Sequence, residues 1–234
     1  MRLDKWLKVS RLIKRRTVAN EACDNARVTA NGRTVKASYD VKVGDVLELK
    51  FGEKTVKVEV LKVADNVGKA DAMLITTPAG ERVLIDAATN KQGKKLVERF
   101  RKSGIGSIDA MIITHYDKDH VGGADQVMEK MKVGTVIMPV YDKESKQHTQ
   151  FVEALAKYPP QETMELSTGQ ETVYTLKSGL ELPIPAAHES YYGSDEENDF
   201  SLAVRMTYGD TTFFFAGDAE NARQKELLAE GNVK

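Results

Sequence analysis

The sequence has a single cysteine, Cys23, among its 234 residues. One cysteine cannot form an internal disulfide, and it cannot build a zinc site from several thiolates. We therefore expect Cys23 to be a small buried residue on a helix. Any metal site must then use ligands other than thiolates.

Long apolar runs are also missing. No stretch approaches the roughly 18 apolar residues that a membrane-spanning helix needs, and the start of the chain lacks the apolar core of a signal peptide. Hydrophobic residues make up 41% of the chain and charged residues 29%, as in ordinary soluble proteins. We expect a cytoplasmic protein with one large domain or two smaller ones.

Acidic residues are sparse near the N-terminus. Residues 1–50 carry 12 Lys and Arg against 6 Asp and Glu, a net charge of +6, whereas residues 51–234 carry 22 against 29, a net charge of −7. The overall charge of −1 therefore hides a basic head and an acidic body. This asymmetry predicts two modules, one of which binds an anionic partner.

Four candidate metal ligands follow a short apolar run at residues 111–113, which is typical of a strand buried on both faces. They fall within six residues and are His115, Asp117, Asp119 and His120. Imidazole and carboxylate suit zinc, manganese or iron. The alternative is a structural histidine beside a solvated acidic loop, but a chance match to all four ligand types at this spacing is rare.

The same stretch resembles the signature of the metallo-β-lactamase fold. Its pattern, His-x-Asp-x-Asp-His, is followed by Gly122 and Gly123, which let the backbone turn closely beneath the site. The commoner signature has His at the third position. The form with Asp, preceded by Thr114, resembles the hydrolase domain of the competence protein ComEC and its soluble relatives.

Weaker similarities extend this resemblance along the chain. Residues 65–75 resemble the family's opening segment, although Ala70 replaces a glycine and an asparagine is inserted. A predicted strand ends in Asp86, as in the family, but the glycine that usually follows near residues 87–88 is absent. Residues 198–202 resemble the family's Asn-x-x-Ser-Leu, and residues 217–220 its Gly-Asp-x-Glu. Strands and helices alternate between these motifs, an α/β layered pattern.

The resemblance implies a site and a reaction. One metal would be held by His115 and Asp117 and a second by Asp119 and His120, with Asp218 between them. The cofactor would be zinc, as one or two ions, with manganese as the alternative. An activated water would attack phosphorus or a carbonyl, with Asp119 and Asp117 as the catalytic carboxylates.

Two features depart from the family. The first metal lacks a third ligand, and His188 is a weak candidate for it because its surroundings match no known signature. The ComEC-like pattern continues to a His-His-Gly-Ser motif that this sequence does not reach. We therefore expect an αββα sandwich that is incomplete at its C-terminus, with a natural fusion, a fragment and an artificial chimera as open explanations.

The basic module is predicted to contain short amphipathic helices, with Thr17 as an N-cap, and a hairpin around Asn31-Gly32. A row of cations on the helical part is the electrostatic footprint of a phosphate-backbone binder. A solvated helix face is the alternative. The cations are Arg2, Lys5, Lys8, Arg11, Lys14, Arg15 and Arg16.

Residues 1–50 also resemble the small RNA-binding domain named after ribosomal protein S-four, most closely its short bacterial form, such as the ribosome-associated quality control protein P. The resemblance rests on residues 2–7, 15–17, 27–28, 31–33 and 43–45. It implies binding to structured RNA, in those relatives on the large ribosomal subunit. The RNA-binding residues carried over are Arg2, Lys5, Arg11, Arg15, Arg16 and Thr17, to which the cation row adds Lys14.

One position departs from that domain. Ala26 stands where the family usually has a glycine after a helix. A left-handed residue is expected at such a helix end, and an alanine adopts that conformation at a cost of roughly 1 kcal/mol.

We therefore predict an S-four-like α+β domain at residues 1–53 and a partial ComEC-like metallo-β-lactamase domain at residues 56–234. The strand expected at residues 55–63 can close the first module or open the second. The leading hypothesis is a metal-dependent hydrolase of nucleic-acid phosphodiesters. Two alternatives are an RNA- or ribosome-binding protein with an inactive hydrolase remnant, and a metal hydrolase of a small ester or lactam.

Overall fold

The computed structural model describes residues 1–10, 12–13, 15–51, 54–60, 63, 71–189, 197–209 and 211–231. Arg11, Lys14 and the 65–70 segment of the family's opening motif lie outside the described residues. Residue contacts divide the chain into two units, Met1–Gly68 and Lys69–Lys234. None of the described helices is both long and apolar enough to cross a lipid bilayer.

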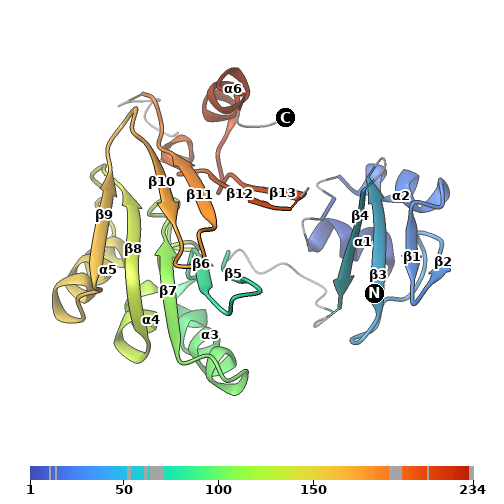
Figure 1. Cartoon of the computed structure of the whole chain (residues 1–234), viewed down its shortest axis with the longest axis horizontal. Helices are drawn as coiled ribbons and strands as arrows, with labels where there is room; N and C mark the ends of the chain where they lie inside the picture. Colours follow the sequence, from blue (N-terminus) through green and yellow to red (C-terminus); the bar gives the residue numbers. More distant parts are fainter. Residues whose placement is uncertain are drawn as a thin grey trace. The chain divides into compact units, whose positions relative to one another are not determined.

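The first unit packs two helices on an antiparallel sheet with the strand order β2-β1-β3-β4 (Figure 1). The helices are α1 (Leu3–Val9) and α2 (Arg16–Asp24), and the strands are β1 (Val28–Ala30), β2 (Arg33–Thr34), β3 (Val46–Phe51) and β4 (Lys54–Glu59). The core is formed by the apolar faces of α1 and α2 with alternate residues of β1 and β3. Its members include Leu3, Trp6, Leu7, Cys23, Val28, Leu47 and Leu49.

Local backbone features of this unit follow from single residues. Asn31 and Gly32 have φ values of 52° and 77° and join β1 to β2, which confirms the predicted hairpin. Ala26 has φ 54°, so the expected left-handed residue after the helix is present. The N-cap prediction for Thr17 is wrong, because α2 already begins at Arg16 and its N-cap is Arg15, which makes no side-chain capping bond.

The strand expected between residues 55 and 63 joins the sheet of the first unit. Strand β4 pairs with β3 along its whole length, from Phe51↔Lys54 to Val46↔Glu59. The predicted division at residues 53–56 therefore falls within a hairpin of this sheet, and the contacts place the division at residues 68 and 69.

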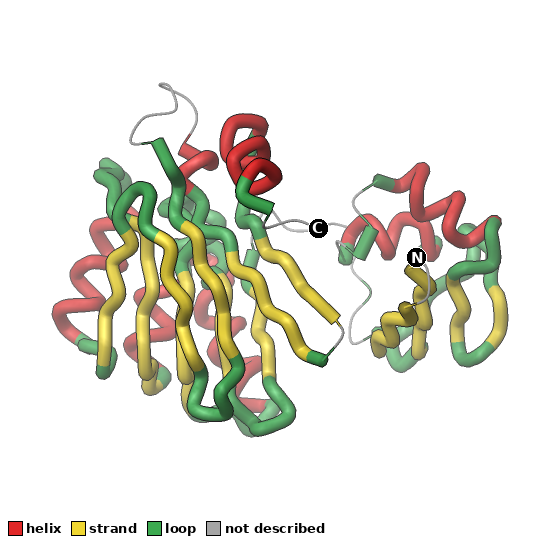
Figure 2. The backbone as a smooth tube through the Cα atoms, turned by 45° about the horizontal axis from the view of Figure 1, so that its top comes forward, coloured by secondary structure: helices red, strands yellow, loops and turns green. Residues whose placement is uncertain are grey.

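The second unit is built on a five-stranded sheet with the order β5-β6-β7-β8-β9, in which β5 is antiparallel and the others are parallel (Figure 1 and Figure 2). Three helices, α3, α4 and α5, cover one face of it. The strands are β5 (Met73–Thr76), β6 (Arg82–Ile85), β7 (Ser107–Ile112), β8 (Lys132–Pro139) and β9 (Glu162–Leu166). The helices are α3 (Asn90–Lys102), α4 (Ala124–Lys130) and α5 (Lys146–Lys157).

Antiparallel hairpins cover the other face of this sheet. The pairs are β10 (Glu171–Thr175) with β11 (Glu181–Pro185), and β12 (Val204–Tyr208) with β13 (Thr211–Phe215). Strand β6 shows how both layers are held, since Leu84 packs towards the helices while Val83 and Ile85 pack towards the hairpins. A 3-10 helix (Glu197–Phe200) precedes β12, and α6 (Asn221–Ala229) follows β13. The predicted α/β layers are confirmed.

Candidate metal centre and RNA-binding surface

The candidate metal centre lies at the carboxyl ends of the parallel strands β6 and β7. The loop after β7 carries His115 and His120, which are both buried, and their ring centroids are 4.1 Å apart. Asp218, which follows β13, joins them from a part of the chain about a hundred positions further on. One ligand atom each of His115, His120 and Asp218 lies within 4.8 Å of the others. These three predicted ligands are therefore brought together.

Two glycines allow the ligand loop to pass this closely under the sheet edge. A Cβ atom on Gly122 would lie 2.2 Å from the carbonyl oxygen of Lys118, and one on Gly123 would lie 2.3 Å from that of Ala87. Both contacts are with backbone atoms, which cannot rotate away. The expected close approach beneath the site is present, and no larger residue fits at either position.

Both imidazoles are held through Nδ1, on the side away from the site. His120 Nδ1 lies 2.7 Å from Asp86 Oδ2, and His115 Nδ1 lies 3.0 Å from Thr114 Oγ1. Asp86 also accepts hydrogen bonds from the backbone N–H of Thr114, at 2.8 Å, and from its hydroxyl, at 2.9 Å. Because the Thr114 proton goes to Asp86, the hydroxyl oxygen is left to accept from His115. In the neutral form of each ring, this arrangement directs the Nε2 lone pair to the site.

Asp86 is the main functional residue that the sequence reasoning missed as a site residue. It is fully buried and has φ 57°, a left-handed conformation that only asparagine, aspartate and glycine adopt readily. The feature of the sequence that could have indicated it was the predicted strand that ends in this acidic residue. Ala88, where the family usually has glycine, also has a positive φ of 63°.

The electrostatics of the site fit a cation. His115 Nε2 is buried and has no hydrogen-bond partner among the described residues, which is costly unless a ligand satisfies it. Burial, followed by the neighbouring His120, lowers the pKa of His115. Burial also opposes protonation of His120, but bonds to Asp218 and Asp86 outweigh it and raise its pKa to about 10. A divalent metal between these residues would take the place of that proton.

A second loop, which follows β8 and carries Tyr141 and Lys143, contacts the ligand loop. The backbone N–H of Tyr116 donates to Tyr141 Oη at 2.7 Å, and Lys143 Nζ lies 3.2 Å from Asp117 Oδ1. The other carboxylate oxygen, Asp117 Oδ2, faces His115 Nε2 at 4.0 Å. Lys143 also pairs with Glu197. Lys143 thus binds one oxygen of Asp117 while the other faces His115, a contact that nothing in the sequence indicated.

Three predicted ligands are not in the group, namely Asp117, Asp119 and His188. Asp119 is half-buried, and its backbone carbonyl accepts from the N–H of Asp71, but its carboxylate is not among the clustered atoms. His188 follows β11 and lies with Glu171 and Glu230, its Nε2 2.9 Å from Glu230 Oε1. Because carboxylates of α6 and its C-terminal end hold His188, it is not placed as a third histidine of the metal centre.

The predicted RNA-binding arginines are organised by a buried carboxylate. Asp4 is only 1% exposed, and its oxygens lie 3.1 Å from Arg2 Nε and 3.0 Å from Arg16 Nε. Burial alone would raise the pKa of Asp4, but the bonds from Arg2 and Arg16 hold it well below its usual value. Both arginine side chains remain about half exposed. Arg15 and Thr17 are also exposed, and Lys5 is partly buried.

Comparisons with known proteins agree with this division. Residues 65–232 match the metallo-beta-lactamase superfamily, and residues 1–47 match the S4 domain. The RQC P-site tRNA stabilizing factor of Halalkalibacterium halodurans is 56% identical over 72 residues, which are 31% of this chain and 82% of the relative. The Bacillus subtilis factor of the same name is 51% identical over 84 residues, or 36% of this chain and 98% of the relative.

A solved metallo-beta-lactamase structure from Cronobacter sakazakii is 20% identical, covers 62% of this chain and 54% of that chain, and has a TM-score of 0.40. The family match spans more than half of the sequence. The chain therefore belongs to the metallo-beta-lactamase superfamily and carries at its N-terminus an S4 domain homologous to the RQC P-site tRNA stabilizing factors.

Proposed function

We propose that the chain is a metal-dependent hydrolase of nucleic-acid phosphodiesters whose S4 domain binds structured RNA. The observation that carries the proposal is the convergence of His115, His120 and Asp218 on one point, with a buried His115 Nε2 that has no protein partner among the described residues. The packing of a hydrophobic core does not require such an arrangement, whereas the coordination of a divalent metal ion does.

We propose zinc as the metal, bound as one or two ions, with manganese as the alternative. Two imidazoles and a carboxylate suit either ion. His115, His120 and Asp218 would hold it, and Asp117 Oδ2 is the next donor at 4.0 Å from His115 Nε2. When bound, such an ion lowers the pKa of a coordinated water and polarises a phosphoryl group.

The protein side chains position the ligands and handle the proton. Asp86 and Thr114 fix the tautomers of the two histidines, so that neither ring has to reorient when a metal enters. We propose that the carboxylate of Asp119 or Asp117 accepts the proton of the attacking water. Asp119 suits this role because its carboxylate makes no hydrogen bond or ion pair within the described part of the chain.

Nucleic acid is the proposed substrate for two reasons. The S4 domain and its relatives, which are named for stabilising tRNA in the P site, support RNA and the ribosome as partners of the N-terminal unit. The Asp form of the ligand motif, with its preceding Thr and following Gly-Gly, resembles the ComEC hydrolase domain, whose relatives are thought to act on DNA. The fold alone does not determine the substrate.

The test is a nuclease assay with the purified full chain. Fluorescent single-stranded DNA, duplex DNA and structured RNA are incubated with the zinc- or manganese-loaded protein. We expect cleavage that a chelator abolishes and that His120→Ala lowers by at least about 100-fold. His188→Ala is the matched control, since it removes a histidine outside the cluster and should retain activity.

Two other outcomes would each favour one of the alternative functions. Metal-dependent hydrolysis of a small ester or lactam without nuclease activity would assign the site to the small-molecule alternative. A chain that binds RNA but hydrolyses none of these substrates with either metal would be an RNA-binding protein with an inactive hydrolase remnant.

A further inference from the structure

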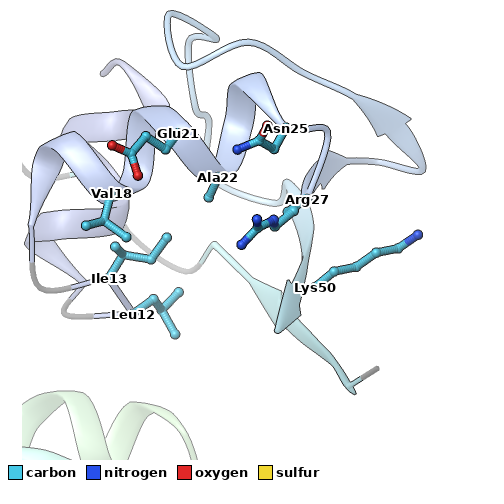
Figure 3. Close-up of a pocket in the computed structure, with 8 residues that line it drawn as sticks. All are labelled: Leu12, Ile13, Val18, Glu21, Ala22, Asn25, Arg27 and Lys50. Atoms are coloured by element: carbon cyan, nitrogen blue, oxygen red, sulfur yellow. The ribbon is translucent and has the colours of Figure 1, made fainter. Parts of the chain in front are cut away.

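A cavity of about 270 Å³ opens on the surface of the S4 unit (Figure 3). Its floor is apolar and comes from the turn before α2 and from α2 itself. The floor residues are Leu12, Ile13, Val18 and Ala22. Val18 is 45% exposed, although Ala19 and Cys23 of the same helix are buried. An exposed apolar floor of this kind indicates a surface that a ligand covers.

The rim of the cavity carries cations that no described carboxylate neutralises. Arg27 and Lys50 are exposed, and neither forms an ion pair or side-chain hydrogen bond within the described residues. In Figure 3, Arg27 reaches towards the floor while Lys50 extends outward. Arg2 and Arg16, in contrast, are already bound to Asp4. Arg27 and Lys50 are therefore freer to meet an anion than Arg2 and Arg16.

The remaining rim groups narrow the chemistry of the ligand. Asn25 offers an amide that can both donate and accept, and Glu21 is the single carboxylate lining the described cavity. The rim thus has two positive charges against one negative charge, on a unit that is basic as a whole. A ligand that suits it has a flat apolar body, polar edges and an anionic group.

We propose that this cavity binds one unpaired nucleotide of an RNA. The base would lie on the apolar floor with the Arg27 guanidinium against its face, and Asn25 would contact its edge. Lys50, which extends outward, would meet the adjacent phosphate. A base inside a duplex cannot enter, so the cavity adds a preference for loops and bulges to the RNA binding proposed above. It does not depend on the metal centre.

The test compares two RNAs that differ in unpaired nucleotides. Fluorescence anisotropy measures binding of the full chain to a hairpin RNA with an open loop and to a blunt duplex with the same stem. Ala22→Met fills the cavity without a change of charge. We expect it to weaken hairpin binding by about fivefold or more, which is the lower end of the loss in affinity when one stacking contact with a base is removed. Duplex binding should be unchanged.

A second variant, which changes charge, tests the proposal independently in case Ala22→Met does not fold. Lys50→Glu alters an exposed side chain, and it should lower hairpin affinity more than the same reversal at Lys36, an exposed lysine that does not line the cavity. Melting curves of all variants should match the wild type.

Three results would overturn the proposal. In the first, both cavity variants bind the hairpin as the wild type does, which would show that the cavity does not bind the RNA. In the second, Ala22→Met weakens hairpin and duplex binding equally. In the third, the wild type binds neither RNA, which would also remove RNA binding from the proposed function without touching the hydrolase.

Discussion

Substitution of Asp86 by asparagine tests how the metal centre is held. Asp86 Oδ1 receives the N–H of Thr114, at 2.8 Å, and Oδ2 faces His120 Nδ1 at 2.7 Å. An asparagine that keeps its oxygen on Thr114 must turn its amide N–H₂ towards His120. The ring then accepts at Nδ1, carries its proton on Nε2 and loses the lone pair that would hold a metal.

The expected effect is large for a residue that never touches the metal. Loss of such a support costs roughly 10- to 100-fold in metal affinity, or about 1.4–2.8 kcal/mol. The backbone should not suffer, because asparagine adopts a positive φ such as the 57° of Asp86 as readily as aspartate does. The metal dissociation constant is measured by competition with a chromophoric chelator.

The matched control is Asp109→Asn. Asp109 lies on β7 and accepts the backbone N–H of Arg82 at 2.8 Å, but it does not contact the histidines. Its replacement should leave metal affinity within about twofold of the wild type. Equal metal affinity of wild type and Asp86→Asn would refute the argument that Asp86 sets the tautomer of His120.

Three further predictions concern other parts of the chain. Lys143→Met should weaken metal binding several-fold by releasing Asp117, whereas Lys143→Arg should restore it in the same chelator competition. Ala26→Gly should raise the free energy of unfolding by about 1 kcal/mol, since φ is already 54° there, as measured by urea denaturation of the S4 unit's transition. The contribution of His120 to the stability of the metal-free protein should be fully present below pH 6.5 and be lost as pH rises through about 10, because the folded-state pKa of His120 is raised above its ordinary value; urea titrations across this range should show no such step for His120→Gln.

The sequence was informative wherever the needed residues are neighbours in the chain. The apolar run before His115 and the ligands that follow it predicted a strand with a metal loop, and β7 ends at Ile112. Asn31-Gly32 predicted its hairpin because only a few residues adopt two successive left-handed conformations. Asp218 came from a family motif and not from spacing.

The sequence was silent where partners are distant in the chain. Lys143 reaches Asp117 only because β7 and β8 are parallel neighbours whose carboxyl ends meet at the same edge of the sheet. No local pattern encodes that pairing. Strand β9 was not predicted either, because most of its residues are polar or partly exposed at the edge of the sheet.

Other predictions failed because local chemistry is ambiguous. A threonine near a helix start favours an N-cap at Thr17, yet α2 begins at Arg16, whose side chain is bonded to Asp4. His188 has the residue type of a metal ligand, but it lies beside Glu230 and hydrogen-bonds to Glu226 through its backbone. Residue type alone could not distinguish these settings.

The proposed function requires that His115, His120 and Asp218 hold a divalent metal. The most direct measurement is the metal content of the purified, zinc-reconstituted chain by elemental mass spectrometry, beside the double variant His115→Ala/His120→Ala and the His188→Ala control. We expect at least one equivalent of metal in the wild type and the control and none in the double variant. Equal metal content in all three proteins, or no metal in any of them, would contradict this expectation.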